Sequence, residues 1–148
     1  CAVCHGVLAD GMNGKARDLL YWKSEKHIED VVINGSSGSH FSMDMPAGMA
    51  YGDDIKAVAT YVSSEFFNNP KSVDKKIFNQ GKVVYETCAS CHGLDGNGID
   101  GVAPSLTNLV GSVLNTGRKG KIGLMPSFQD LNDIQKSALN AYIYNLED

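Results

Sequence analysis

All four cysteines of the sequence fall in two copies of one pattern, Cys-x-x-Cys-His. The copies are Cys1-Ala2-Val3-Cys4-His5 and Cys88-Ala89-Ser90-Cys91-His92. Two thiols three positions apart can bond the vinyl groups of one haem, and the adjoining histidine can then bind the iron. A zinc site or a redox-active dithiol would also use the cysteine pair, but neither accounts for a histidine in both copies. The pattern predicts two covalently attached haems c, with His5 and His92 as iron ligands.

A methionine followed by proline comes after each motif and is the expected sixth ligand of the iron. Met125 is the only methionine after the second motif. A thioether is a soft ligand that suits haem iron, and His/Met ligation raises the reduction potential; a methionine that merely fills the core is the alternative. Met45, before Pro46, is the predicted ligand in the first half. Its alternatives there are an open site or another residue of the same loop, namely His40, Met43 or Met49.

The order of features repeats along the chain. Cys1 and Cys88 lie 87 residues apart, and a glycine-rich stretch, a Met-Pro pair and a Tyr-aliphatic pair follow each motif in turn. The spacing from the methionine to the tyrosine is 16 residues in the first half and 17 in the second. This predicts two copies of one small domain, residues 1–68 and 73–148, joined by a linker over 69–72.

Apolar residues at helical spacing predict helices over residues 25–34, 53–66, 73–87 and 132–146. We expect Gly35 to end the first helix and Asp53 or Asp54 to cap the second. Asn132 and Gln135 are expected to form a capping box on the last. No segment alternates as a strand does, so the predicted fold class is all-α.

Composition limits the classes of protein that this chain can be. With 148 residues, 43% hydrophobic and 20% charged, it is globular, and a net charge of −4 argues against a nucleic-acid binder. No apolar run approaches the roughly 20 residues of a membrane helix. Because the sequence begins on a haem cysteine, we expect further residues upstream. These would include the helix before the first motif and a signal peptide or membrane anchor.

Both halves resemble the class I c-type cytochromes. The matching segments are Cys-x-x-Cys-His-Gly, Gly101–Leu106, Gly123–Phe128 and the terminal Tyr142–Leu146. The resemblance implies two tandem small cytochrome c domains, each wrapped round one covalently attached haem. It also implies that the carbonyl of Pro104 accepts a hydrogen bond from the ring of His92. The helix with Gly81 is then expected to cross the terminal helix near Tyr142, since glycine permits close approach.

The resemblance makes three more side chains candidates for haem contacts. Arg17 aligns with Pro104, which puts the equivalent contact of His5 in doubt but offers a partner for a haem propionate. Arg118 could also pair with a propionate, and Trp22 could donate its indole N–H to one. The alternatives are an exposed arginine, a solvated basic loop and a filler of the haem wall, respectively.

Within this family, the order of motifs is most similar to the dihaem subunit of cbb3-type haem-copper oxidases. That implies an electron-input subunit with no catalysis of its own, with redox donor and acceptor proteins and oxidase subunits as partners. The implied location is the bacterial periplasm, either soluble or on the periplasmic face of the inner membrane. The alternatives are a free-standing periplasmic dihaem carrier, a cytochrome subunit of a dehydrogenase, and a dihaem peroxidase or gas sensor. Two closed His/Met sites weigh against the last pair.

Overall fold

The computed structural model describes residues 2–12, 18–37, 44–67, 73–99, 102–108, 114, 118–119 and 124–145. It describes the backbone alone for a few of these: Ala2, Trp22, Arg118, Lys119, Leu124, Met125 and Tyr144. The described chain is helical apart from one short pair of strands.

The helices are, in chain order, α1 (Ala2–His5), α2 (Leu19–Trp22), α3 (Glu25–Asn34), α4 (Asp53–Phe66), α5 (Lys75–His92) and α7 (Asp133–Tyr144). The strands β1 (Arg118–Lys119) and β2 (Leu124–Met125) pair antiparallel, with Arg118 opposite Met125. The described residues therefore agree with the predicted all-α class, and this pair of two-residue strands is their one departure from it. Two residues per strand are too few to show the alternation by which a strand is recognised in a sequence.

Three helices largely follow their predicted bounds. Both α3 and α4 begin and end where expected, and Gly35 caps the C-terminus of α3 with a φ of 71°. The capping box of α7 is present: Asn132 Oδ1 accepts from the backbone N–H of Gln135 at 2.9 Å, and Gln135 Oε1 accepts from that of Asn132 at 3.0 Å. The predicted end of this helix at Leu146 lies outside the described residues.

Two details of the helix ends differ from prediction. The N-cap of α4 is Gly52, with no side-chain cap, and Asp53 and Asp54 lie inside the first turn, where their charges still favour the positive end of the helix dipole. Helix α5 does not stop at Thr87 but runs on through the second cysteine motif to His92. No helix-breaking residue occurs before Gly93, which ends the helix with a φ of 76°.

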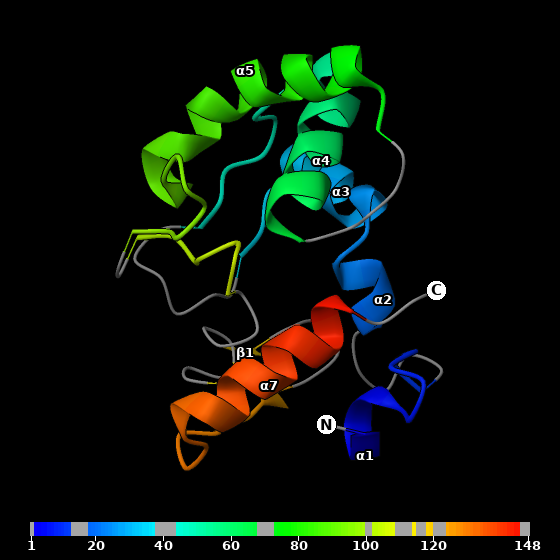
Figure 1. The fold of residues 1–148 in the computed structure, drawn as a ribbon, viewed down its shortest axis with the longest axis vertical. Helices are drawn as coiled ribbons and strands as arrows, with labels where there is room; N and C mark the ends of the chain where they lie inside the picture. The colour runs from blue at the N-terminus through cyan, green and yellow to red at the C-terminus, as the bar shows by residue number, and fades with distance from the viewer. Residues whose placement is uncertain are drawn as a thin grey trace.

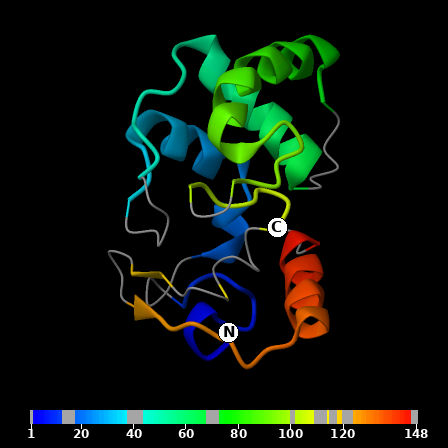
Figure 2. The same cartoon turned by 90° about the vertical axis from the view of Figure 1, so that its left-hand side faces the viewer.

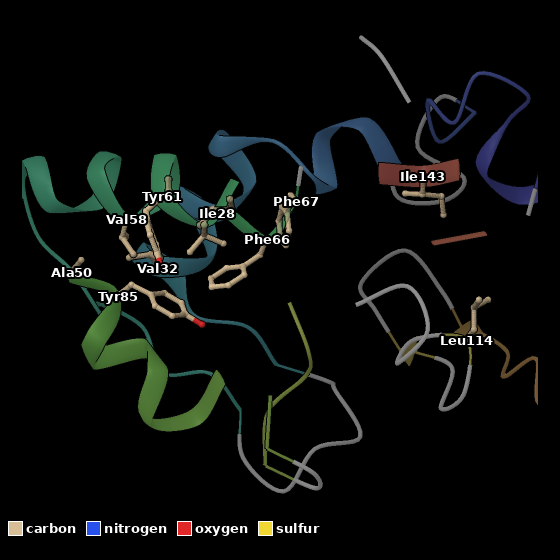
Figure 3. Close-up of a cluster of buried hydrophobic side chains, with 12 residues drawn as sticks. Ile28, Val32, Ala50, Val58, Tyr61, Phe66, Phe67, Tyr85, Leu114 and Ile143 are labelled. Carbon is tan, nitrogen blue, oxygen red and sulfur yellow. The ribbon is translucent and has the colours of Figure 1, made fainter. Parts of the chain in front are cut away.

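Helix α4 is the centre of the larger packed unit. It contacts α5 extensively and α3 on another side, and these three helices occupy one half of the molecule while α1, α7 and the strands occupy the other (Figures 1 and 2). Figure 3 shows the side chains of one buried apolar cluster, most of them between α3, α4 and α5, with Leu114 and Ile143 farther from these helices.

The close crossing expected at Gly81 is present, but its partner is not the terminal helix. A Cβ on Gly81 would overlap the carbonyl of Ala57 and come within 2.8 Å of the Tyr61 side chain, so Gly81 packs on α4. Tyr142, the expected partner, is 59% exposed. The expectation was wrong because α4 and α7 share one pattern, Ala57-x-x-x-Tyr61 and Ala138-x-x-x-Tyr142. Sequence alone does not say which of the two surfaces receives the glycine.

Within the part of the chain that the structure describes, we find no helix that is both long and apolar enough to cross a membrane.

Replacing Gly81 with alanine tests the α4–α5 contact, because the contact decides whether the substitution raises or lowers the free energy of unfolding. In an exposed helix this change stabilises by about 0.5–1 kcal/mol. Here the new Cβ must displace the Ala57 carbonyl, so we expect a loss of about 1–3 kcal/mol in the free energy of unfolding. Denaturant unfolding of the holoprotein measures it. Lys82→Ala, on the exposed side of the same helix, is the control and should be nearly neutral; stabilisation by Gly81→Ala would contradict this packing.

Candidate haem-binding sites

The second Cys-x-x-Cys-His motif forms the last turn of α5. Cys88 and His92 are four residues apart and so share one face of the helix, and Cys91 lies beside them. All three side chains are partly buried, and burial raises the pKa of the Cys88 thiol. The helix therefore presents two thiols and an imidazole within one turn and a half.

The ring of His92 is held by a single backbone acceptor. Its Nδ1 lies 3.0 Å from the carbonyl oxygen of Pro104, and because a carbonyl only accepts, Nδ1 carries the proton. Burial lowers the pKa of His92, against a smaller raising effect of this hydrogen bond. The side chain is thus a neutral imidazole whose Nε2 lone pair remains available, which is the form that binds a metal.

A glycine lets the Pro104 segment reach the histidine. Gly98 has a φ of 75° and its N–H donates to the His92 carbonyl at 2.7 Å. A Cβ at Gly98 would come within 2.6 Å of the Ala103 oxygen and within 2.7 Å of the Pro104 carbonyl carbon. The fold-back of the chain beneath His92 therefore depends on the missing side chain at this position.

Aromatic side chains from two helices support the same loop. The buried Tyr85 hydroxyl donates to the carbonyl of Gly93 at 2.8 Å, and its ring lies 5.1 Å from that of Phe66. Phe66 in turn fills the space beside Gly96, where a Cβ would lie 2.6 Å from its ring. The loop of the second motif is thereby fixed to both α5 and α4.

The loop after the first motif repeats this backbone geometry 87 residues earlier. Three hydrogen bonds recur at equivalent positions. The N–H of Gly11 donates to the His5 carbonyl at 2.8 Å, as Gly98 does to His92 at 2.7 Å, and that of Leu19 donates to the Ala9 carbonyl at 2.9 Å, as Leu106 does to Gly96 at 2.7 Å. The N–H of Tyr21 donates to the Asp18 side chain at 3.0 Å, as that of Asn108 does to the Ser105 side chain at 2.9 Å. Even the left-handed backbone of Gly96 (φ 69°) is matched at Ala9 (φ 60°), where a side chain makes it unfavourable. One local structure is therefore built twice.

The expected methionine ligands are placed to different degrees. Met45 is partly buried against the core, and its backbone exchanges hydrogen bonds of 3.0 Å with Ser36. Met49 packs against the same core. Met125 lies in β2, where the structure describes only its backbone. The other candidates of the first loop, His40 and Met43, lie outside the described residues.

The structure does not bring the expected ligands of the first haem together. Helix α1, which carries Cys4 and His5, lies in the half of the molecule away from α3, α4 and the segment 44–50 that joins them (Figures 1 and 2). Cys1 and Arg17 lie outside the described residues, and Trp22 and Arg118 are placed by backbone only, in α2 and β1. Among the described residues, no three or more His, Cys, Asp or Glu side chains gather as a metal-ion site of their own.

Comparison with known proteins shows which proteins this chain is similar to. The family model described as cytochrome c oxidase, cbb3-type, subunit III matches residues 77–143. Over 99% of its length, the chain is 35% identical to the cbb3-type cytochrome c oxidase subunit CcoP of Helicobacter pylori strain 52. It is 30% identical, again over 99% of its length, to the CcoP subunits of Rubrivivax gelatinosus and Azospirillum brasilense. The chain is CcoP-like. It spans 55%, 51% and 58% of the length of these relatives, respectively.

Kinship with c-type cytochromes implies covalently bound haem c, and the second motif of this CcoP-like chain fits that group. The imidazole of His92 is neutral and oriented, and the thiols of Cys88 and Cys91 lie on the preceding turn. Cys88 and Cys91 would hold haem c through thioether bonds, and His92 would bind its iron through Nε2. The first motif shares the backbone hydrogen bonds of the loop, but Cys1 and Arg17 lie outside the described residues.

Sequence reasoning missed several residues that shape the second site of this CcoP-like chain. Tyr85 was not singled out, yet its hydroxyl binds the haem-motif loop. Asn97 and Thr107 were not singled out, although their side chains join the two segments that enclose His92. A usable signal was available for Thr107, which is polar at the position where the first half has Leu20.

Gly98→Ala tests whether the turn positions the Pro104 carbonyl. The substitution adds a crowded Cβ to a left-handed backbone, so we expect a loss of about 2–4 kcal/mol in the free energy of unfolding. Gly52→Ala is the matched control, because Gly52 also has a positive φ (56°) but has nothing within 4 Å of its Cβ position. Gly52→Ala should lower the free energy of unfolding by the backbone strain alone, about 1–2 kcal/mol. Equal losses in the two variants, measured by denaturant unfolding, would show that the approach of Pro104 does not matter.

Proposed function

We propose that this chain is a dihaem c-type cytochrome that carries electrons into a cbb3-type terminal oxidase. The observation that carries the proposal is the loop after Cys-x-x-Cys-His, built twice with the same hydrogen bonds and offset by 87 residues. The CcoP relatives supply the context of an oxidase subunit.

In the proposed assignment, Cys1 and Cys4 hold one haem and Cys88 and Cys91 the other, with His5 and His92 on the irons. Met125 is the sixth ligand in the second half. Met45 is assigned to the first half from its place in the repeat, since the described geometry does not join it to His5. A haem held in this way supplies a one-electron Fe(III)/Fe(II) couple whose potential follows the axial ligands and their hydrogen bonds.

Two ligands from the chain on each iron leave no coordination position for a substrate. The chain then contributes orientation, burial and hydrogen bonding, and no bond chemistry of its own. Trp22, Arg17 and Arg118 are proposed contacts of the haem edges or propionates.

The proposed domain division is 1–68 and 73–148, with 69–72 as the linker. Helix α5 of the second proposed domain packs on α4 of the first, so the two proposed domains contact each other through these helices.

The proposed partners are the other oxidase subunits and a soluble redox donor. Covalent haem attachment places the chain in the bacterial periplasm or on the periplasmic face of the inner membrane, with an anchor outside this segment. With a net charge of −4, the chain fits a donor that carries a basic patch, and such encounters weaken with ionic strength.

Haem content tests the proposal directly. The full chain, matured in a host that attaches haem c, should carry two haems per chain by pyridine haemochrome assay and by mass of its peptides. Cys88→Ala with Cys91→Ala should leave only the first haem, and Cys1→Ala with Cys4→Ala only the second. Either pair should abolish electron transfer from a reduced soluble cytochrome into the assembled oxidase.

Ser90→Ala is the control, since Ser90 lies between the two cysteines but its hydroxyl bonds only the Thr87 carbonyl and the Cys91 sulfur. It should keep both haems and full transfer. A wild-type chain with one haem, or with bound zinc in place of haem, would overturn the assignment.

A further inference from the structure

A row of side-chain hydrogen bonds joins the two segments that enclose His92. The Thr107 hydroxyl donates to Asn97 Oδ1 at 2.8 Å, and the Asn97 amide donates to a carboxylate oxygen of Asp95 at 2.7 Å. The Asn97 backbone N–H donates to the other oxygen of that carboxylate at 3.1 Å. At the opposite end, the hydroxyls of Ser105 and Thr107 lie 3.0 Å apart.

Counting protons gives the part of this row from Thr107 to Asp95 a single direction. Thr107 has one hydroxyl proton and donates it to Asn97 Oδ1, and the Asn97 amide donates to Asp95. The Ser105 hydroxyl lies 3.0 Å from Thr107 Oγ1 and also donates to the Gly96 carbonyl at 3.5 Å. Ser105 Oγ in turn accepts the backbone N–H of Asn108 at 2.9 Å. The row therefore ends on the Asp95 carboxylate, whose pKa is lowered by the hydrogen bonds from Asn97, so that it is an ionised acceptor at neutral pH.

The row acts on the segment that carries the Pro104 carbonyl. The backbone N–H of Leu106 already donates to the Gly96 carbonyl at 2.7 Å. The backbone N–H of Thr107 donates to the same carbonyl at 3.3 Å. The Thr107 side chain, three residues beyond Pro104, adds a bond to a different residue of that loop, Asn97. Bonds to two residues of the loop resist rotation of the segment about the Gly96 carbonyl.

The first half shares the backbone attachment but cannot form the side-chain row. Leu19 donates to Ala9 as Leu106 does to Gly96. The positions 87 residues before Asp95, Asn97 and Thr107 hold different residues, which are Leu8, Asp10 and Leu20. Because two of them are leucines, the first half cannot form the side-chain attachment that Thr107 makes near His92.

We infer that Thr107 and Asn97 are positioning residues for His92, acting through the Pro104 carbonyl on the iron ligand of the second site alone. The inference rests on the proposed function. A well-aligned Nδ1–H···O bond makes the imidazole a stronger donor to iron, which favours Fe(III). Loosening the Pro104 segment should therefore raise the reduction potential of the second haem and leave that of the first unchanged.

Two substitutions at one position test this in the full holoprotein. Thr107→Val keeps the shape and removes the hydroxyl, whereas Thr107→Ser keeps the hydroxyl. Loss of one net hydrogen bond corresponds to about a two- to tenfold change in an equilibrium constant. We expect Thr107→Val to shift the Fe(III)/Fe(II) equilibrium of the second haem by that factor, at most about 59 mV, and Thr107→Ser to match wild type.

Spectroelectrochemical titration gives the reduction potentials of the two haems. The double variant Cys88→Ala, Cys91→Ala has only the first haem, so the potential that is missing from its titration belongs to the second haem. Electron paramagnetic resonance of the ferric protein should show altered g values for that haem only. Leu20→Val, at the equivalent position of the first half, should move neither potential. Asn97→Ala removes the amide oxygen that accepts the Thr107 hydroxyl proton, and Asn97 is exposed. This variant should shift the potential of the second haem as Thr107→Val does, so it tests the inference if Thr107→Val does not take up haem.

Two failures are distinguishable. If wild type carries two haems but Thr107→Val and Asn97→Ala keep its potentials and g values, the row is merely structural and the inference is overturned. The inference is also overturned if both haems shift together. If wild type lacks the second haem, the proposed function itself fails.

Discussion

The hydrogen bond from His92 to the Pro104 carbonyl is the constraint on which the rest of the second site depends. It spans 3.0 Å between residues twelve positions apart, so the chain between them must turn back on itself. The glycines at 93, 96 and 98 have positive φ angles of 76°, 69° and 75°, and these build the turn. Tyr85 and Phe66 then hold the turn to two helices. A neutral, oriented imidazole is the product of all these contacts.

The same turn in the first half shows which parts of this design are essential. The backbone hydrogen bonds recur even though Ala9 replaces a glycine. In the second half the acceptor beneath the histidine is the backbone carbonyl of Pro104; Arg17, at the equivalent position of the first half, lies outside the described residues. What proline adds is a fixed φ, and what the second half adds is the side-chain row from Ser105 to Asp95. Two sites of one design can thus be tuned to differ.

Much of this could be predicted from local sequence. The bounds of α3 and α4, the cap at Gly35 and the box of Asn132 and Gln135 follow from local preferences that the fold does not override. The reach of α5 to His92 was underestimated, since the apolar spacing was followed only to Thr87 whereas no residue between Thr87 and Gly93 ends the helix. Its partner was wrong because α4 and α7 present the same Ala-x-x-x-Tyr surface. The choice between equivalent surfaces is a property of the whole packed chain, so no local pattern reveals it.

The central claim is that both irons are closed by ligands from the chain and exchange electrons only. The absorption spectrum of the dithionite-reduced holoprotein, recorded with and without carbon monoxide, tests it most directly. We predict c-type bands that carbon monoxide leaves unchanged, because neither iron has a free position. A shift of the bands of either haem would contradict the account, since it would show an open or displaceable ligand position where a substrate or gas could bind.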